Sequence, residues 1–370
     1  MAEKNRSIGE MARSGPFSYL DCFYIFMPIN PKAKLVENIL DLKLLEQKPT
    51  RDGFGLGLVE AADENPNVVG LCADLTESTR MEAFAKKYPE RFVEMGVAEQ
   101  NMASVAAGMS LMGKIPYITS YAMFSPGRNW EQLRTTICYN DANVKIIGSH
   151  AGVSVGPDGA THQAIEDIAI TRPIANMRVF APCDMHEAKK VTYAISKIYG
   201  PCYTRFAREK TPVFTTKDTP FEIGKAQIFW DASEEIGLHA GNPISKRLDV
   251  AIVACGPLLH NAIFAAAELE KEGVAVRVLN MVSIKPMDEE TIIQVAKDAG
   301  SVVTVEEHQV AGGMGSAVAE VLAKNYPVPI EFIGVQNRFG ESGSPNELIE
   351  HFGMGVSHIY RAAKKVVARK

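Results

Sequence analysis

Two short segments combine residue types and spacings that could do chemistry. Residues 96–101 (GVAEQN) place an acid where a helix is expected to begin, and residues 156–163 (GPDGATHQ) place a histidine in a glycine-rich loop. An acid held out of water can share a proton with a ring nitrogen of a bound molecule. An imidazole can donate, accept or pass a proton near neutral pH, which suits the handling of a hydroxyl group. The two segments therefore indicate proton transfer involving a bound organic ligand.

Each of these residues also has an ordinary structural interpretation. A carboxylate such as Glu99 is favoured in the first turn of any helix by the helix dipole and the free backbone N–H groups. A single histidine after an apolar strand, such as His150, is usually a satisfied loop or core residue. However, His150 and His162 enclose the acid Asp158, which lies between glycines. This arrangement is harder to explain by folding alone.

The elements that must position these residues alternate between short β-branched runs and longer helical stretches. This rhythm predicts an α/β fold of two domains with mainly parallel sheets. We expect an N-terminal extension at 1–47, a first domain at 48–215, a linker at 216–246 and a second domain at 247–370. The expected strands are 68–73, 115–120, 144–149, 177–181, 202–206, 226–230, 250–255, 275–280, 301–306 and 330–333. The expected helices are 52–64, 99–112, 129–139, 184–198, 259–271, 289–299 and 315–325, the fourth capped by Asp184 with Glu187 three residues on.

The two segments resemble signatures of the pyrimidine-binding domain of transketolases, which transfer two-carbon ketol units between sugar phosphates with thiamine diphosphate. Residues 96–101 are similar to the family's Gly-x-x-Glu-x signature, and the stretch from His150 through Glu166 aligns with a second family motif without gaps. The resemblance implies that Glu99 contacts N1′ of the cofactor's aminopyrimidine. It also implies that Val97 holds the cofactor in its bent shape, although core filling is an equally good interpretation of Val97.

The resemblance also assigns the remaining walls of the cofactor pocket. Tyr121 and Phe124 match aromatic residues that stack on the pyrimidine, while Gly127 stands where a third aromatic is expected. The gap is either left open or filled by Met123 or a partner chain. Asp74 matches the acid that borders the pocket at the subunit contact.

A sugar-phosphate site is implied by the same family pattern. His150 and His162 are expected to hydrogen-bond the C1 hydroxyl and carbonyl region of the donor sugar, and Asp158 the neighbouring hydroxyl. The expected clamp for the terminal phosphate consists of Arg51, Ser78 and Arg208. Guanidinium groups grip phosphate through two parallel hydrogen bonds. The chain departs from the family pattern at Ala151, Gly152, Pro157 and Ala160, which leaves the assigned side chains intact but weakens any inference about sugar preference.

The half of a transketolase that binds the diphosphate has no counterpart before Arg51, where no Gly-Asp-Gly motif occurs. We therefore expect this chain, similar to the family over residues 48–368, to be the C-terminal subunit of a split transketolase of the pentose phosphate pathway. The N-terminal transketolase subunit would carry Mg²⁺ and the diphosphate site. The expected assembly is a heterotetramer with a homodimer contact and the active site at a subunit interface.

Composition narrows the classes of partner and compartment. A net charge of −5 gives no basis for nucleic-acid binding. The six cysteines are scattered and form no CxxC pair, which predicts buried free thiols in a reducing compartment, hence a cytoplasmic protein without zinc. The apolar patch at 22–27 is too short to cross a membrane or act as a signal peptide. Residues 1 to about 30 are expected to pack on a neighbour or fray, unless translation begins at Met27.

Three other functions fit parts of the pattern. The main enzymatic alternatives are a 1-deoxyxylulose-5-phosphate synthase fragment and the beta subunit of a 2-oxoacid dehydrogenase, but residues 161–166 (THQAIE) and His150 fit transketolases better. A non-catalytic regulatory or scaffold subunit is the third. Residues 306–316 (EEHQVAGGMGS) lack the GxGxxG spacing, so they predict a glycine turn that begins a helix, to which we assign no chemistry.

Overall fold

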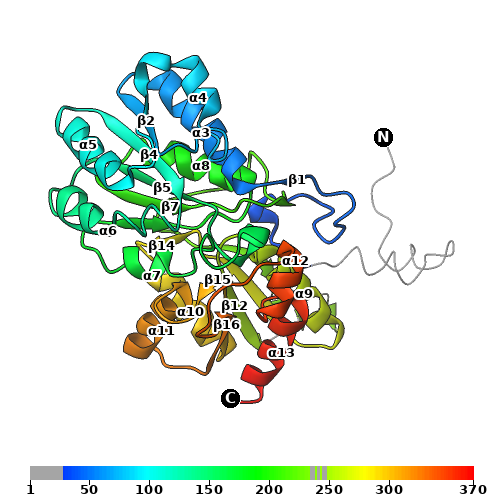
Figure 1. Cartoon of the computed structure of the whole chain (residues 1–370). Helices are drawn as coiled ribbons and strands as arrows, with labels where there is room; N and C mark the ends of the chain where they lie inside the picture. The colour runs from blue at the N-terminus through cyan, green and yellow to red at the C-terminus, as the bar shows by residue number, and fades with distance from the viewer. Residues whose placement is uncertain (1–27, 234–237, 240–241, 244–247) are drawn as a thin grey trace, which may run out of the picture.

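The computed structural model describes residues 28–233, 238–239, 242–243 and 248–370. The expectations for residues 1–27, including Cys22 and the start at Met27, lie outside these residues. Two α/β halves pack against each other along a broad interface, the first drawn in blue to green and the second in yellow to red (Figure 1). The fold is thus a mixed α/β structure with mainly parallel sheets, as predicted.

The first sheet has seven strands in the order β14-β6-β7-β5-β4-β2-β3. Their bounds are β2 Val68–Cys72, β3 Phe92–Glu94, β4 Ile115–Tyr121, β5 Lys145–Ser149, β6 Arg178–Phe180, β7 Cys202–Arg205 and β14 Ser283–Lys285. All neighbouring strands pair in parallel except β14 and β6. Helices cover both faces, so the central strands β2 and β5 are buried along their whole length.

The helices α3 (Thr50–Glu64), α4 (Glu82–Lys87) and α8 (Met185–Ile195) cover one face of this sheet. The other face carries α5 (Glu99–Leu111) and the π-helix η3 (Leu133–Cys138), which continues the single turn of α6 (Trp130–Gln132). The helix expected at 129–139 is present at Trp130–Cys138, with one α-helical turn that passes into a π-helix. Short segments complete this half: β1 Gln47–Lys48, η2 Pro89–Arg91, η4 Val153–Asp158, α7 Asp167–Thr171 and β8 Thr211–Pro212. The 3-10 helix η1 (Pro31–Ala33) packs instead on the second half.

The second sheet has five strands in the order β16-β15-β12-β13-β9. Their bounds are β9 Gln227–Asp231, β12 Val250–Ala254, β13 Val276–Asn280, β15 Val302–Gln309 and β16 Ile330–Val335. One face is covered by α9 (Leu259–Lys271) and α13 (Val356–Val367), and the other by α10 (Glu289–Ala299) and α11 (Met314–Asn325). The short helix α12 (Pro345–His351) packs on η4 of the first half. The strand expected in the linker is β9, an antiparallel edge of this sheet.

The two halves share more than a covalent link. Strand β14 follows β13 of the second sheet yet pairs with β6 of the first, which the sequence did not predict. One hydrophobic cluster also runs continuously from α5 and β4 to α10 and α11. The two halves are therefore one packed body, so that residues of the second half can support a site on the first.

Two local predictions also have clear outcomes. Asp184 caps α8 as expected by accepting from the backbone N–H of Glu187 at 3.0 Å, whereas the Glu187 carboxylate accepts from Cys183 N rather than from the cap residue itself. The five described cysteines are free and buried, as predicted; they are Cys72, Cys138, Cys183, Cys202 and Cys255. None of the described helices combines the length and the hydrophobicity that a bilayer crossing requires.

Candidate active site

Most of the residues singled out by sequence lie where neighbouring strands of the first sheet end. Asp74 follows β2, Tyr121 ends β4, and His150 follows β5, which are three adjacent parallel strands. Glu99 begins the helix after β3, and Arg208 follows β7 on the other side of β5. The carboxyl ends of parallel strands meet at one edge of a sheet, where α/β proteins commonly bind ligands. The fold thus gathers these residues along a single edge.

Glu99 is a buried acid with an unused oxygen. It begins α5 as predicted, its residue is 3% exposed, and its Oε2 has no hydrogen-bond partner among the described residues. The Asn129 side-chain amide donates to the main-chain carbonyl of Glu99 at 3.2 Å, which ties the start of α5 to the loop after β4. Leaving a buried acceptor unpaired costs about 1–3 kcal/mol. A ligand that brings an N–H or shared proton to Glu99 Oε2 would remove this cost, so the site fits the aminopyrimidine of thiamine diphosphate.

The loop after β4 forms an aromatic wall, although one position differs from the family pattern. The rings of Tyr121 and Phe124 lie nearly parallel with centroids 6.2 Å apart. A Cβ at Gly127 would lie 1.9 Å from the carbonyl oxygen of Met123, so this backbone has no room for a third aromatic there. The Met123 side chain packs instead on a small cluster that contains Ala122. Close approach of the loop backbone therefore explains the missing aromatic residue.

His150 is held as a neutral imidazole. Arg51 Nη1 lies 3.2 Å from His150 Nε2, and an arginine can only donate, so Nε2 accepts and Nδ1 carries the proton toward Ser149 Oγ at 2.9 Å. The ring stacks on Tyr121 with centroids 3.8 Å apart, which covers one face of the tyrosine. Burial, and then the positive charges of Arg51 and Arg208, lower the pKa of His150 from 6.5 to about 3.

We expect His150 not to titrate between pH 8 and pH 5. The His150 imidazole takes up a proton near pH 6.5 in the unfolded chain, but only near its pKa of about 3 in the folded chain. The contribution of His150 to the free energy of unfolding therefore falls as the pH drops from 6.5 to about 3. The measurement is NMR of the chain labelled in its histidine rings, with His150→Gln used to assign the signal. A ring signal that shifts with a midpoint near pH 6.5 would contradict the tautomer described above.

The residues predicted to bind a phosphate lie near one another, together with Arg80, which the sequence did not single out. Arg51 Nη1 donates to the main-chain oxygen of Ser78 at 2.7 Å. Burial, the charge of Arg80 and that of Arg208 lower the pKa of Arg51, so three guanidinium groups lie within electrostatic reach of one another. Arg80 is paired with Asp52, at 2.6 Å between Nε and Oδ1. Such a cluster of positive groups in a protein of net charge −5 can attract an anion locally.

The glycine-rich loop brings its polar side chains toward the same place. The His162 ring lies edge-on to Phe124 at 5.5 Å and to Tyr121 at 6.2 Å between centroids. Asp158 Oδ1 is 4.0 Å from Arg208 Nη1, and that same nitrogen donates to Val155 O at 2.7 Å. The structure therefore places the sugar-site candidates next to the aromatic wall and the arginines.

Val97 differs from the other candidates. This residue is 77% exposed, which excludes the core-filling interpretation. Asp74 is also exposed and adopts a left-handed φ of 57°, with its backbone N–H held by Glu94 Oε1 at 2.7 Å. Within the described residues, no group of three or more histidine, cysteine, aspartate or glutamate side chains could hold a metal ion.

Sequence reasoning missed the residues that hold the site residues in place. Ser149 contacts His150, and Asn129 contacts Glu99. Arg80 contacts Asp52, the residue next to Arg51. No motif marks Ser149, Asn129 or Arg80. His150 and Arg80 both have a positive φ, 57° and 68°, a backbone conformation that residues other than glycine rarely adopt. Such geometry depends on the fold and has no signature in the sequence.

Comparison with known proteins agrees with this geometry. Family models for "Transketolase, pyrimidine binding domain" and "Transketolase, C-terminal domain" match residues 46–213 and 240–359. The chain is 42% identical over 310 residues to a "Putative transketolase C-terminal section" of Methanocaldococcus jannaschii, a match that covers 83% of this chain and 92% of the relative. It therefore belongs to the transketolase family.

Within the family, the chain matches C-terminal sections that occur as separate subunits. It is 37% identical over 326 residues to "6-deoxy-6-sulfo-D-fructose transketolase subunit SqwH" of Clostridium sp. strain MSTE9, covering 88% of this chain and 97% of the relative. A solved structure titled "Split gene transketolase, inactive beta4 tetramer" superposes with a TM-score of 0.77 at 43% identity, covering 86% of this chain and 98% of that one. The chain spans about half the length of some other relatives, for example 50% of "Transketolase-like protein 2" of Mus musculus. This chain thus corresponds to the C-terminal section of a split transketolase.

Proposed function

We propose that this chain is the catalytic C-terminal subunit of a transketolase that transfers a two-carbon ketol unit from a ketose phosphate to an aldose phosphate. The observation that carries the proposal is the buried, unpartnered Oε2 of Glu99, on the same sheet edge as two histidines and three arginines. A scaffold subunit would have no use for an unsatisfied buried acid, which costs stability and is characteristic of a functional site.

The pyrimidine end of thiamine diphosphate would be held by this chain. When bound, the cofactor supplies the nucleophilic carbon that carries the two-carbon unit. Glu99 would share a proton with the ring nitrogen N1′ in a site closed to water. Tyr121 and Phe124 would flank the ring, and Val97 and Asp74 would border it where a partner subunit meets this chain. Mg²⁺ and the diphosphate would be bound by the partner.

The donor sugar would lie between the histidines and the arginine cluster. His150 is neutral with its proton on Nδ1, and its Nε2 would accept from a sugar hydroxyl once Arg51, which now donates to that nitrogen, turns to the phosphate. His162 would bind the carbonyl region, and Asp158 the next hydroxyl. Arg51, Ser78 and Arg208 would bind the terminal phosphate, with Arg80 adding positive charge. Because the related SqwH subunit is named for a sulfo sugar, a sulfonate is the alternative anion for the same cluster.

The partner would be an N-terminal transketolase subunit, assembled with this chain into a heterotetramer. The two relatives named as a C-terminal section and as a subunit support this arrangement. The solved split-gene relative, whose title describes an inactive tetramer of β chains, also supports it. An active site shared between two subunits then needs both chains in one complex.

The experiment that tests this function compares donor substrates in the assembled complex. With ribose 5-phosphate as acceptor, we expect transfer from xylulose 5-phosphate and none from pyruvate. Pyruvate with glyceraldehyde 3-phosphate tests the deoxyxylulose-phosphate synthase alternative, and 6-deoxy-6-sulfofructose tests the sulfonate alternative. Pyruvate consumption without ketol transfer would replace the proposal with the synthase or dehydrogenase function.

A further inference from the structure

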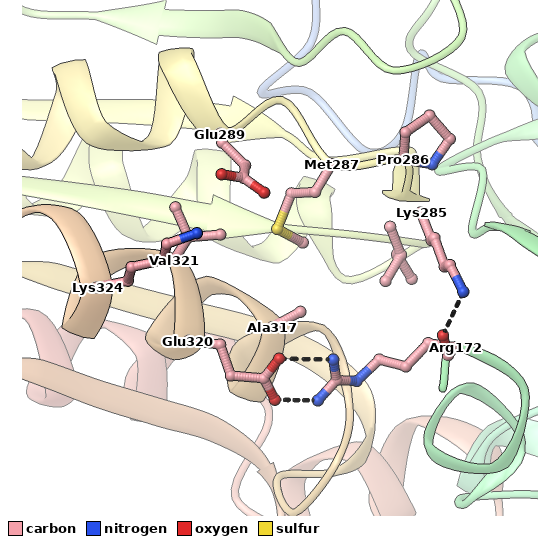
Figure 2. A pocket seen from close by; sticks show the side chains of 10 residues that line it. Arg172, Lys285, Pro286, Met287, Glu289, Ala317, Glu320, Val321 and Lys324 are labelled. Atoms are coloured by element: carbon pink, nitrogen blue, oxygen red, sulfur yellow. Dashed lines mark hydrogen bonds and ion pairs between the residues drawn. The ribbon is translucent and has the colours of Figure 1, made fainter. Parts of the chain in front are cut away.

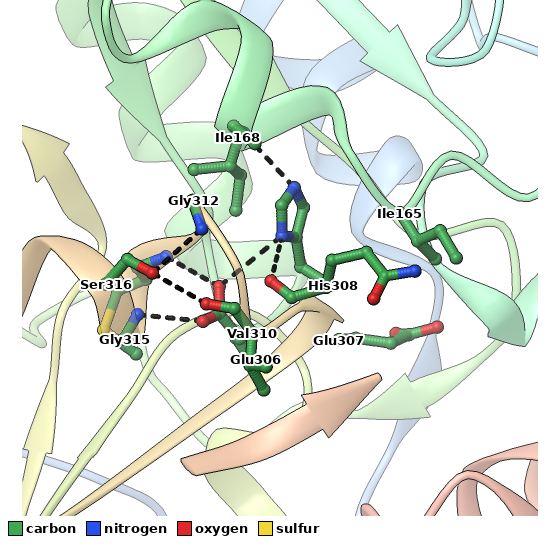
Figure 3. A network of polar contacts seen from close by, with 12 residues as sticks. Ile165, Ile168, Glu306, Glu307, His308, Val310, Gly312, Gly315 and Ser316 are labelled. Carbon is green, nitrogen blue, oxygen red and sulfur yellow. Dashed lines mark hydrogen bonds and ion pairs between the residues drawn. The ribbon is translucent and has the colours of Figure 1, made fainter. Parts of the chain in front are cut away.

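The glycine-rich loop, taken from here on with its flanking residues 152–169, rests on the end of β15 in the second half. Gln309 N donates to Ile165 O at 2.8 Å, and Ala169 N donates to His308 Nε2 at 3.3 Å. Figure 3 shows the His308 side chain extending from β15 toward the segment that carries Ile165 and Ile168. The sequence assigned no chemistry to residues Glu306–His308. This run lies where β15 reaches the interface of the two halves.

The two adjacent glutamates of this strand point to opposite sides. Glu306 serves its own half by accepting from Met314 N and Gly315 N at 2.7 and 2.8 Å, at the start of α11 (Figure 3). Glu307 instead faces the loop of the other half, and its Oε1 accepts from Ser154 N at 2.6 Å. Strand geometry requires this alternation. Glu307 is therefore the acid that the second half presents to the glycine-rich loop.

Glu307 is itself held firmly. Its main-chain oxygen accepts from both Nη1 and Nη2 of Arg205, at 3.0 and 3.1 Å, and Arg205 Nε lies 2.9 Å from Asp167 Oδ2. On the loop side, a Cβ at Gly152 would lie 2.2 Å from Glu307 Oε1, so only glycine lets the loop approach this closely. Glu307 is 5% exposed. Its carboxylate thus presents a fixed acceptor to a loop that is in direct contact with it.

Glu307 is one of several supports of this loop. Val153 and Val155 are buried, Gln163 Nε2 donates to Val153 O at 3.0 Å, and α12 packs on η4. Gly152, Gly156 and Gly159 all have positive φ, at 91°, 84° and 73°, so the backbone is intrinsically permissive there. A cavity of about 440 Å³ is lined by Ser154 and Glu307 among other residues of both halves. The remaining polar contacts to the second half include Gln163 Nε2, which donates to Glu341 O at 2.8 Å.

We propose that Glu307 is a positioning residue for the sugar-phosphate site, an inference that rests on the function proposed above. Its carboxylate fixes the Ser154 amide, and the next residue, Val155, presents the carbonyl that holds the Arg208 guanidinium at 2.7 Å. Asp158 follows three residues later, 4.0 Å from Arg208. The second half of the chain therefore sets the place of an anion-binding arginine without contacting the substrate.

The test replaces Glu307 in the assembled complex and compares a matched interface variant. Glu307→Ala is expected to raise the KM for xylulose 5-phosphate roughly tenfold while kcat changes about twofold or less, because a charge-assisted hydrogen bond is lost outside the reacting centre. Glu307→Gln keeps an oxygen that can accept from Ser154 N and is expected to restore most of the affinity. If Glu307→Ala does not fold, Glu307→Asp, which retracts the carboxylate by one methylene, takes its place with the same expectation.

Glu320→Gln is the control for general loosening of the interface. Glu320 pairs with Arg172 across the two halves, with 3.0 Å between Oε2 and Nη1, and the pair lines a groove to which no residue of the glycine-rich loop contributes (Figure 2). This variant is expected to leave the KM unchanged. An equal rise in KM for Glu320→Gln, or equal damage by Glu307→Gln and Glu307→Ala, would overturn the positioning role.

A second readout separates this inference from the proposed function. Amide hydrogen exchange of the full chain is expected to be faster at Ser154 in Glu307→Ala than in the unmodified chain, and unchanged in Glu320→Gln. If the assembled complex transfers no ketol unit, the proposed function fails, while the exchange at Ser154 still decides whether Glu307 fixes the loop. Unchanged exchange at Ser154 in Glu307→Ala would overturn the inference.

Discussion

Neither this chain nor its partner is expected to transfer a ketol unit alone, whereas their mixture with thiamine diphosphate and Mg²⁺ is expected to be active. The described residues supply an acid, histidines and arginines on one sheet edge, but no group of metal ligands. Because the proposed function assigns the diphosphate and Mg²⁺ to the partner, this chain would hold only the pyrimidine end of the cofactor. Because fixing reactants in place contributes several powers of ten to catalysis, we expect the mixture to exceed either chain by at least about 10³-fold.

The measurement is an assay of xylulose 5-phosphate with ribose 5-phosphate, run on each purified chain and on an equimolar mixture. Size-exclusion chromatography of the mixture shows whether the chains associate, so a failure to assemble can be told from a failure of chemistry. Full turnover by this chain on its own would refute the shared active site.

Glu99→Gln is expected to lower the activity of the assembled complex by about 10²-fold or more, the usual scale for loss of a proton-transfer group. The amide has nearly the same size and can still accept a hydrogen bond, but it cannot share a proton with a ring nitrogen as a carboxyl group does. Glu99 is 3% exposed, so a water molecule cannot take over the proton transfer that the carboxyl group performs.

Two controls distinguish this role from that of an ordinary acid at a helix start. Glu289 lies in the first turn of α10, so Glu289→Gln removes a comparable interaction with a helix dipole and is expected to leave activity unchanged. Glu99→Gln is expected to change the free energy of unfolding by no more than about 1 kcal/mol, the scale of that dipole interaction. Equal activity of the Glu99→Gln complex and the unmodified complex would remove Glu99 from the mechanism.

The parts of the fold that could be predicted are those fixed by local sequence. Helices α9 and α10 begin and end where expected, and α10 carries its own signals: Asp288 accepts from Thr291 N at 3.2 Å, and Gly300 ends the helix with a φ of 70°. The π-helix at Leu133–Cys138 and the strand at Ser283–Lys285 were not predictable in this way. Their conformations depend on contacts between segments far apart in the chain.

The same distinction applies to the candidate site, where some residues are marked by local sequence and others depend on the fold. Glu99 could be placed at a helix start, and the histidines in their loop, because residue type and spacing mark them. The supporting contacts could not be placed, since Glu307 reaches Ser154 across 153 positions of sequence and Gly127 is explained only by the carbonyl of Met123 beside it. Motifs thus predict the groups proposed to meet the ligands, while the fold decides which other residues hold them.

The most direct test is the structure of the two-subunit complex with thiamine diphosphate bound. We expect a Glu99 carboxylate oxygen within about 2.6–3.2 Å of N1′ of the aminopyrimidine, the range of a shared proton. The diphosphate and its metal ion are expected on the partner subunit. A Glu99 side chain that faces solvent, away from both cofactor and partner, would contradict the account.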